Sequence, residues 1–234
     1  AIGHMLEPTA ELVHLPHSML RIYPLRSPGV VDAYTSSRFY GFPLNVPAHR
    51  EGSIGRIMPY ILQENTETIP QFSEYDHDFT ISTPYYYGLQ LEDFDIQAGV
   101  TTSHRAGMMQ FHFPDGYDPH ILLQTPGDGH MELLKNGAIQ GFEMRFGMKH
   151  YFYVLSDHAF SIEESNPQTG KNASMHLKFS KTQGPVHIRF GISFIDEEQA
   201  RINLEKEVLN RDFEKVKTDA EKTWNAHLAG IEVE

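Results

Sequence analysis

The stretch Val186-His187-Ile188-Arg189-Phe190-Gly191-Ile192-Ser193-Phe194 decides the fold class. Every second residue from Val186 to Phe194 is Val, Ile or Phe, and the residues between them are polar or small. Successive side chains of a strand point to opposite faces, so one face of this strand is apolar and the other is polar. This pattern is typical of a half-buried antiparallel strand.

The same type of segment recurs through residues 6–195. Gly, Pro, Asn or Asp interrupts the chain at intervals of about 8–12 residues, and short aromatic or β-branched runs lie between these breaks. Clear examples are residues 19–23, 85–91, 109–113 and 151–155. The spacing predicts a mainly β fold, an antiparallel β-sandwich in which two sheets pack together.

The hydrophobic period changes at Asp196. Asp196 and Gln199 have the spacing of a capping box, which marks a helix start. Apolar residues then recur at helical spacing, first Ala200, Leu204 and Val208, and later Phe213, Val216, Ala220 and Trp224. The pattern predicts a C-terminal α-helical tail over residues 196–234.

Composition excludes several classes of function. The chain has 234 residues, 31 of them acidic and 19 basic, which gives a formal net charge of -12. Such a charge repels phosphate backbones, so we expect no nucleic-acid partner. No apolar run reaches the roughly 18 residues that a membrane-spanning helix needs, so we expect no membrane span. The absence of cysteine excludes disulfides, zinc-thiolate sites and a cysteine nucleophile.

Three carboxylate pairs could in principle serve acid–base hydrolysis, which needs two separated carboxyl groups. They are Glu163 with Glu164, Asp93 with Asp95, and Glu197 with Glu198. Each pair lies in a polar turn or at a helix start, where carboxylates are solvated or favoured by the helix dipole. We therefore predict no catalytic residue in this chain.

Metal and phosphate sites are also not predicted. Residues 76–78 and 157–158 combine carboxylate with imidazole, but they lack the spacing of a known metal site. The glycine-containing segment 125–130 lacks the lysine and the following helix of a phosphate loop, and its composition favours a turn. Tyr85 and Tyr87 could offer a stacking surface for a sugar, although core packing is favoured for this tyrosine run.

Three segments resemble the N-terminal domain of glycoside hydrolase family 92, the α-mannosidase type. The most specific is GISFIDEEQARINLE at 191–205, with Asp212-Phe213 and Trp224-Asn225 after it. The second comprises TPYYY at 83–87, TTSHRAG at 101–107 and FHFP at 111–114. The third comprises LPHSMLRIYP at 15–24 and YGF at 40–42.

The resemblance implies a two-domain parent enzyme, an inverting and exo-acting α-1,2-mannosidase. Residues 1–5 are expected to be a cloning remnant, residues 6–195 the β-sandwich, and residues 196–234 a tail leading to an absent (α/α)6 catalytic domain. That domain would supply the acid, the base and most ligands of a calcium ion. The parent would be bacterial, secreted or periplasmic, and would act on a mannoside glycan, whereas this chain alone would be inactive.

The resemblance also points to candidate binding residues. PLNVPAHREG at 43–52 replaces the loop that approaches the sugar in the family. Its His49, Arg50 and Glu51 could hydrogen-bond sugar hydroxyls, and the alternative is a solvated turn. His17 occupies a family phenylalanine position and is a further substrate-binding candidate. Trp224 is expected to pack on the sandwich or on the absent domain.

Two other classes of function remain open at this stage. The chain could be a stand-alone carbohydrate-binding module, or a structural domain without a ligand. A domain separated from its barrel would also leave apolar area exposed near the tail, which could drive self-association. A gene that continues into helical repeats with paired carboxylates would favour the enzyme hypothesis over these two classes.

Overall fold

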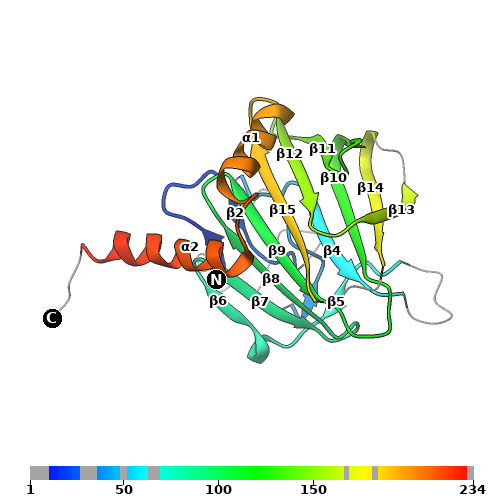
Figure 1. Ribbon diagram of the computed structural model, residues 1–234, viewed down its shortest axis with the longest axis horizontal. Coiled ribbons are helices and arrows are strands. Elements are labelled where there is room, and N and C mark those ends of the chain that lie inside the picture. Colours follow the sequence, from blue (N-terminus) through cyan, green and yellow to red (C-terminus); the bar gives the residue numbers. More distant parts are fainter. Residues whose placement is uncertain are drawn as a thin grey trace, which may run out of the picture.

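The computed structural model describes residues 11–26, 36–47, 52–62, 69–165, 169–180 and 184–230. It confirms the predicted class, which is mainly β with two helices at the C-terminal side (Figure 1). The expected cloning remnant, residues 1–5, lies outside the described residues.

Every strand pairing within the described ranges is antiparallel. The elements are β1 (Val13–His14), β2 (Arg21–Ile22), β3 (Arg38–Phe39), β4 (Arg56–Tyr60), β5 (Ser73–Glu74), the 3-10 helix η3 (His77–Phe79), β6 (Ile81–Thr83), β7 (Tyr86–Leu91), β8 (Ile96–Thr102), β9 (Ala106–His112), β10 (His120–Leu133), β11 (Ile139–Arg145), β12 (Met148–Ser156), β13 (Phe160–Ser165), β14 (Thr169–Phe179), β15 (Val186–Ser193), α1 (Glu197–Glu207) and α2 (Phe213–Leu228).

One large sheet runs in the order β13-β14-β10-β11-β12-β15-β9-β8-β7-β6. The sheet divides at β10, because residues 120–124 pair with β4 and residues 128–133 pair with β11. β14 follows both halves of β10 along its other side. The short pairs β1-β2 and β3-β5 are separate from this sheet.

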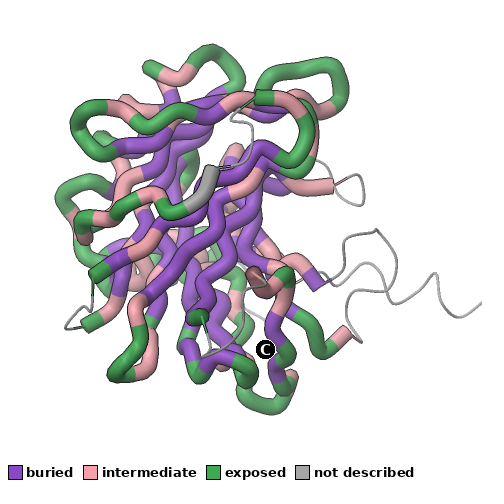
Figure 2. Tube along the Cα trace, turned by 90° about the vertical axis from the view of Figure 1, so that its right-hand side faces the viewer, coloured by how far each residue is buried: buried purple, intermediate pink, exposed green. Residues whose placement is uncertain are grey.

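The main core lies between the part of the large sheet that contains β4 and the part that contains β8 and β15, and the segments around β1, β2 and β3 also contribute to it. Ile57 and Met58 of β4 belong to the same buried cluster as Val100 of β8 and Phe190 of β15, and so does Leu20 from before β2. Purple strands through the centre of the molecule show this burial (Figure 2). Apolar side chains from two layers therefore meet face to face, as the sandwich prediction required.

The turn predicted at residues 125–130 is wrong. These residues lie within β10, where a bulge interrupts the pairing with β14 between Thr125 and Asp128. A bulge uses the same Gly and Pro residues as a turn, because both need backbone that departs from a regular strand. Pairing with β11 and β14, which are distant in sequence, keeps the strand continuous.

The alternation in β15 is confirmed except at its end. Val186, Ile188, Phe190 and Ile192 are buried, whereas Phe194 lies beyond the strand and is 42% exposed. The face predicted to be polar is covered by α1. A Cβ at Gly191 would lie 2.3 Å from the carbonyl oxygen of Ala200, so glycine allows the helix backbone to approach the sheet.

The predicted helix start at Asp196 is confirmed, and the second predicted helix begins after Asp212. The Asp196 carboxylate accepts a hydrogen bond from the Gln199 N–H, and Asp212 accepts one from the Lys215 N–H. The apolar stripes of α1 and α2 are buried and form a second core cluster with Ala106, Met108 and Tyr153. None of the described helices is long and apolar enough to span a membrane.

Candidate functional site

The candidate binding loop is the tip of a narrow hairpin. Phe42 bridges Ile57, and Asn45 bridges Ile54, so the chain runs out and back through paired main chains. The tip residues His49, Arg50 and Glu51 lie outside the described residues. Their substrate role therefore stays a prediction, and only the two flanks of the tip can be described.

The incoming flank is fixed to β2. The Arg21 guanidinium donates to the carbonyl oxygen of Pro47 at 2.7 Å. The side-chain oxygen of the buried Asn45 accepts hydrogen bonds from the main-chain N–H groups of Arg21 and Val46. These contacts fix the position at which the chain enters the tip.

The outgoing flank is fixed to β11 by a buried carboxylate. Glu143 is fully buried and accepts hydrogen bonds from the Gly55 N–H at 2.7 Å and the Gly127 N–H at 2.8 Å. Burial raises the pKa of Glu143, and these hydrogen bonds and nearby Arg145 oppose that rise. Glu143 therefore joins the hairpin to the bulge of β10.

Arg145 and His150 lie beside this flank, and the sequence analysis did not identify them. Gly52 packs under the Arg145 guanidinium, and His150 is the cross-strand partner of Glu143. Arg145 Nε and both ring nitrogens of His150 are buried without a hydrogen-bond partner in the described part of the chain. Burial lowers the pKa of His150, which favours the neutral ring. Buried polar atoms without a partner are uncommon in native structures, so these atoms call for an explanation.

His17 lies in the turn between β1 and β2, and its side chain is exposed. Its φ of 58° is in the left-handed region, which is uncommon for a residue other than glycine. The ring packs edge-on against His227 of α2, with 5.5 Å between centroids. His17 is therefore next to the tail helix, and its predicted substrate contact is untested.

Trp224 is half-buried and packs on the sandwich. Its indole N–H donates to the carbonyl oxygen of His14 at 2.7 Å, and its ring meets the His14 ring edge-on. The contact with the sandwich that the sequence analysis allowed is thus present. The proposed interdomain contact of Trp224 stays a prediction. Figure 1 shows α2 extending away from the body beyond this contact.

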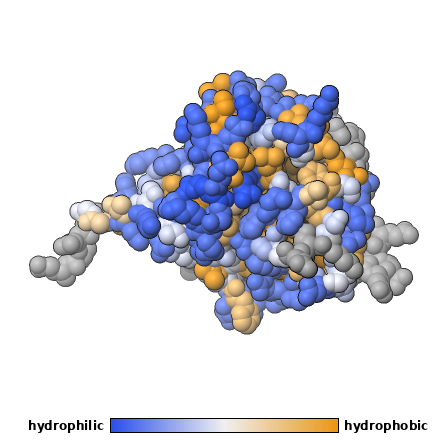
Figure 3. Space-filling view, viewed as in Figure 1, coloured by the Kyte–Doolittle hydropathy of each residue, from blue (hydrophilic) through white to orange (hydrophobic). Residues whose placement is uncertain are grey.

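Exposed apolar side chains occur near the tail and also elsewhere. Near the helices they are Phe194, Ile195, Leu209 and Leu228. Figure 3 shows one hydrophobic group beside α1 and another at the lower edge, where η3 and β6 lie in Figure 1. Phe79 and Ile81 of these lower elements are 72% and 57% exposed.

Five of the six carboxylates considered for catalysis are in ordinary surroundings, and the side chain of Glu164 lies outside the described residues. Glu163 contacts Lys178 and His120, Asp93 accepts from the Glu74 N–H, Asp95 accepts from Gln90, Glu197 lies in the first turn of α1, and Glu198 pairs with Arg201. Asp76 caps η3. Within the described residues, no three His, Asp or Glu side chains lie together as metal ligands.

Comparison with known proteins gives a consistent result. The model of the glycosyl hydrolase family 92 N-terminal domain matches residues 7–193. An uncharacterized secreted glycosidase of the fungus Arthroderma benhamiae is 45% identical over 227 residues, a match that covers 75% of this chain and 29% of that protein.

Two solved structures from Bacteroides thetaiotaomicron share the fold. A family 92 inverting mannosidase has a TM-score of 0.82 at 21% identity, covering 97% of this chain and 34% of its own. A family 92 α-mannosidase in complex with mannoimidazole has a TM-score of 0.80 at 19% identity, covering 95% of this chain and 35% of its own. This chain thus spans about a third of these proteins. Because the family model covers most of the sequence and the fold agrees, the chain belongs to glycosyl hydrolase family 92, whose N-terminal domain it forms.

Proposed function

We propose that this chain is the non-catalytic part of an inverting, exo-acting α-mannosidase. In that enzyme it supports the catalytic domain and contributes one wall of the substrate cleft. The observation that carries the proposal is the family match over residues 7–193 in a chain that spans about a third of the solved mannosidases. The proposed parent is secreted, in keeping with the name of the fungal relative.

The chemistry of the described carboxylates supports a non-catalytic role. Inversion needs two carboxyl groups separated by roughly 6.5–9.5 Å, with one of them protonated. Glu143 has the raised pKa of a potential acid, but it is fully buried and bound by two main-chain N–H groups. It therefore cannot reach a sugar, and we assign both catalytic carboxyl groups to the remainder of the parent.

We place the substrate contacts of this domain at the hairpin tip. Arg21 and Glu143 hold the two flanks of the tip, which would give its donors and acceptors a fixed base. Arg145 and the buried His150 add polar groups beside the outgoing flank. The calcium ion of the parent would need ligands beyond the described residues, which lack a suitable cluster.

The purified chain is expected to leave aryl α-mannosides intact, with or without added calcium, while the parent hydrolyses them. The measurement is release of the aryl alcohol, followed by proton NMR of the first-formed sugar anomer. A parent whose product retains the anomeric configuration would disprove the inverting mechanism. Turnover by the chain that persists through successive purification steps would disprove its non-catalytic role.

In the parent, His49→Ala and Arg50→Ala are each expected to lower kcat/KM about tenfold, equivalent to ~1.4 kcal/mol of transition-state binding. Each substitution removes a side chain proposed to hydrogen-bond the sugar. The melting temperature should stay constant, because the flanks rather than the tip hold the hairpin in place. Arg21→Met is the useful contrast, since it releases Pro47 and should lower stability as well. Wild-type kinetics in both tip variants would establish the solvated-turn alternative.

A further inference from the structure

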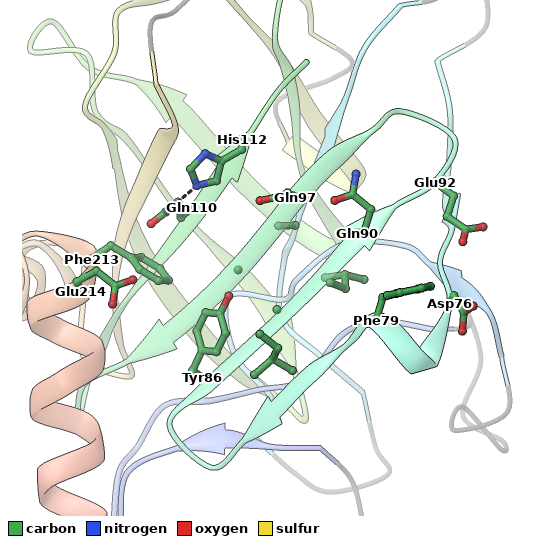
Figure 4. A pocket seen from close by; sticks show the side chains of 15 residues that line it. Asp76, Phe79, Tyr86, Gln90, Glu92, Gln97, Gln110, His112, Phe213 and Glu214 are labelled. Atoms are coloured by element: carbon green, nitrogen blue, oxygen red, sulfur yellow. Dashed lines mark hydrogen bonds between the residues drawn. The ribbon is translucent and has the colours of Figure 1, made fainter. Parts of the chain in front are cut away.

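A pocket of about 550 Å³ lies on the outer face of the sheet. Its floor is formed by β7, β8 and β9, one side by η3 and β6, and the other by the start of α2 (Figure 4). This volume is within the usual range for small-ligand sites. The sequence analysis did not find the pocket, because its residues come together only through strand pairing.

Two glycines leave room for the Tyr86 ring. Gly88 and Gly99 are cross-strand partners, and Gly99 pairs with Gln110 on the next strand. The Tyr86 ring lies over both glycines, since a Cβ at Gly88 would be 2.3 Å from the Tyr86 hydroxyl. Lys217 covers the other side of that ring at 4.3 Å from its centroid. Tyr86 therefore forms a wall of the pocket rather than a free stacking surface.

The next row of the sheet is polar. Gln90, Gln97 and His112 are direct neighbours across β7, β8 and β9. Figure 4 shows their polar ends on one side of the pocket, with the rings of Phe79 and Tyr86 on the other. Amide and imidazole groups offer both donors and acceptors. An apolar ring facing such a row suits a ligand that has one apolar face and polar edges.

Hydrogen bonds hold two members of this polar row, Gln90 and His112, in place. Gln90 donates to Asp95 at 2.8 Å. His112 contacts Gln110, and Gln110 Oε1 lies 3.3 Å from His187 Nε2. The other nitrogen of that ring, Nδ1, lies 2.6 Å from Asp157 Oδ2. This series of hydrogen bonds from Asp157 to His112 therefore orients the His112 ring before any ligand arrives.

The series of hydrogen bonds from His112 to Asp157 ends in a charged group. Burial alone would raise the pKa of Asp157, but hydrogen bonds from the ring and main chain of His187 outweigh it and hold the pKa below its usual range. Asp157 is then an anion at neutral pH that fixes the His187 ring. Burial and the neighbouring His187 lower the pKa of His112, which keeps that ring neutral.

The charges around the pocket select the class of ligand. Asp76, Glu92 and Glu214 line the pocket, and no Lys or Arg is among its lining residues. These carboxylates repel phosphates, sulfates and acidic sugars, whereas neutral hydroxyl groups can donate to them. A pyranose ring has an apolar C–H face that can pack on Phe79, which is 72% exposed.

We infer that this pocket is a second carbohydrate site, which binds a neutral oligosaccharide and performs no chemistry on it. It goes beyond the proposed function, which assigns the substrate contacts of this domain to His49, Arg50 and Glu51. Phe79 stacks on one sugar ring, and the row of Gln90, Gln97 and His112 binds its hydroxyl groups. The site would hold a glycan chain near the enzyme while its end is cleaved elsewhere.

The test is affinity electrophoresis of this chain through gels that contain α-mannan, glucomannan or xylan. At least one of these neutral polymers is expected to retard the wild-type chain. Phe79→Ala and Gln97→Ala should each weaken that retardation about tenfold, while Phe79→Trp should preserve it. The matched control is Phe146→Ala, which removes an exposed aromatic from the turn between β11 and β12.

Several results would overturn the inference. They are absence of retardation by all three polymers, full retardation of Phe79→Ala and Gln97→Ala, or an equal loss in Phe146→Ala. A further result concerns the backbone amide NMR signals of Gln97 and His112. If they shift with protein concentration and do not shift when mannobiose is added, the pocket binds a second copy of the chain instead of a sugar. Because no hydrolysis is measured, failure here leaves the proposed function standing, and an inactive parent would leave this site standing.

Discussion

Replacing Gly191 with alanine is expected to lower the free energy of unfolding by about 3 kcal/mol, at the upper end of the usual cost of overpacking. The new Cβ would lie 2.3 Å from the carbonyl oxygen of Ala200 and 2.8 Å from the Leu204 N–H nitrogen. Both atoms belong to the backbone of α1, so no side chain can move aside. The helix would have to shift away from β15, uncovering its buried apolar stripe. The melting temperature should fall by about 6–12 °C.

The direction of the stability change in Gly191→Ala distinguishes a steric clash with α1 from the effect of alanine on backbone entropy. Alanine in a strand interior is normally more stable than glycine by about 0.5–1 kcal/mol. Gly230→Ala is the matched control, since nothing lies within 4 Å of a Cβ at that position. It should change stability by less than about 0.5 kcal/mol. An unchanged or higher melting temperature for Gly191→Ala would show that α1 is free to move.

Arg26→Met is expected to cost about 3–5 kcal/mol, which is typical when one partner of a buried ion pair is removed. The Arg26 side chain is 5% exposed and pairs with Glu11, whose side chain is 16% exposed. Arg26 also donates to the Tyr87 hydroxyl at 3.1 Å and lies over the Tyr75 ring. Methionine fills similar space but leaves a buried carboxylate without its cation. Urea unfolding should show a lower midpoint with an unchanged slope.

A surface arginine on α1, Arg201, provides the comparison for Arg26→Met. Arg201 contacts Glu198 and Glu205 on the surface of α1, so Arg201→Met should cost much less stability than Arg26→Met. The double variant Arg26→Met with Glu11→Gln should recover part of the lost stability, because it removes the stranded charge. Equal costs for Arg26→Met and Arg201→Met would contradict a buried-pair role.

Short sequence patterns predicted correctly the strand and the helix start that depend on neighbouring residues. The alternation from Val186 to Ile192 and the capping aspartate at 196 each act within a few residues, and both are confirmed. Features that depend on distant pairing were missed. Residues 125–130 carry turn-forming residues, yet pairing with β11 and β14 holds them in one long strand.

The candidate sites show the same limit. The hairpin tip was identified through family resemblance, and its anchors Glu143 and Arg145 come from β11, about 90 residues away. The pocket depends on the register of three strands, which a sequence pattern does not fix. One signal was available, because Gly88 and Gly99 interrupt two strands of otherwise large residues. Glycine in a strand interior often marks a close approach or a hollow.

The hydrogen bond between Trp224 and His14 joins residues 210 positions apart, and this has a consequence for the order of folding. During synthesis at about 5–20 residues per second, His14 would wait roughly 10–40 s for its partner. The N–H of His14 also needs the carbonyl of Pro84, and Leu20 needs that of His104. The segments around β1 and β2 are therefore synthesised early, but their hydrogen bonds are completed last. Val13, Leu20 and Ile22 belong to the main core, so they stay uncovered until the later sheet strands form, and a chaperone is expected to bind them on the nascent chain.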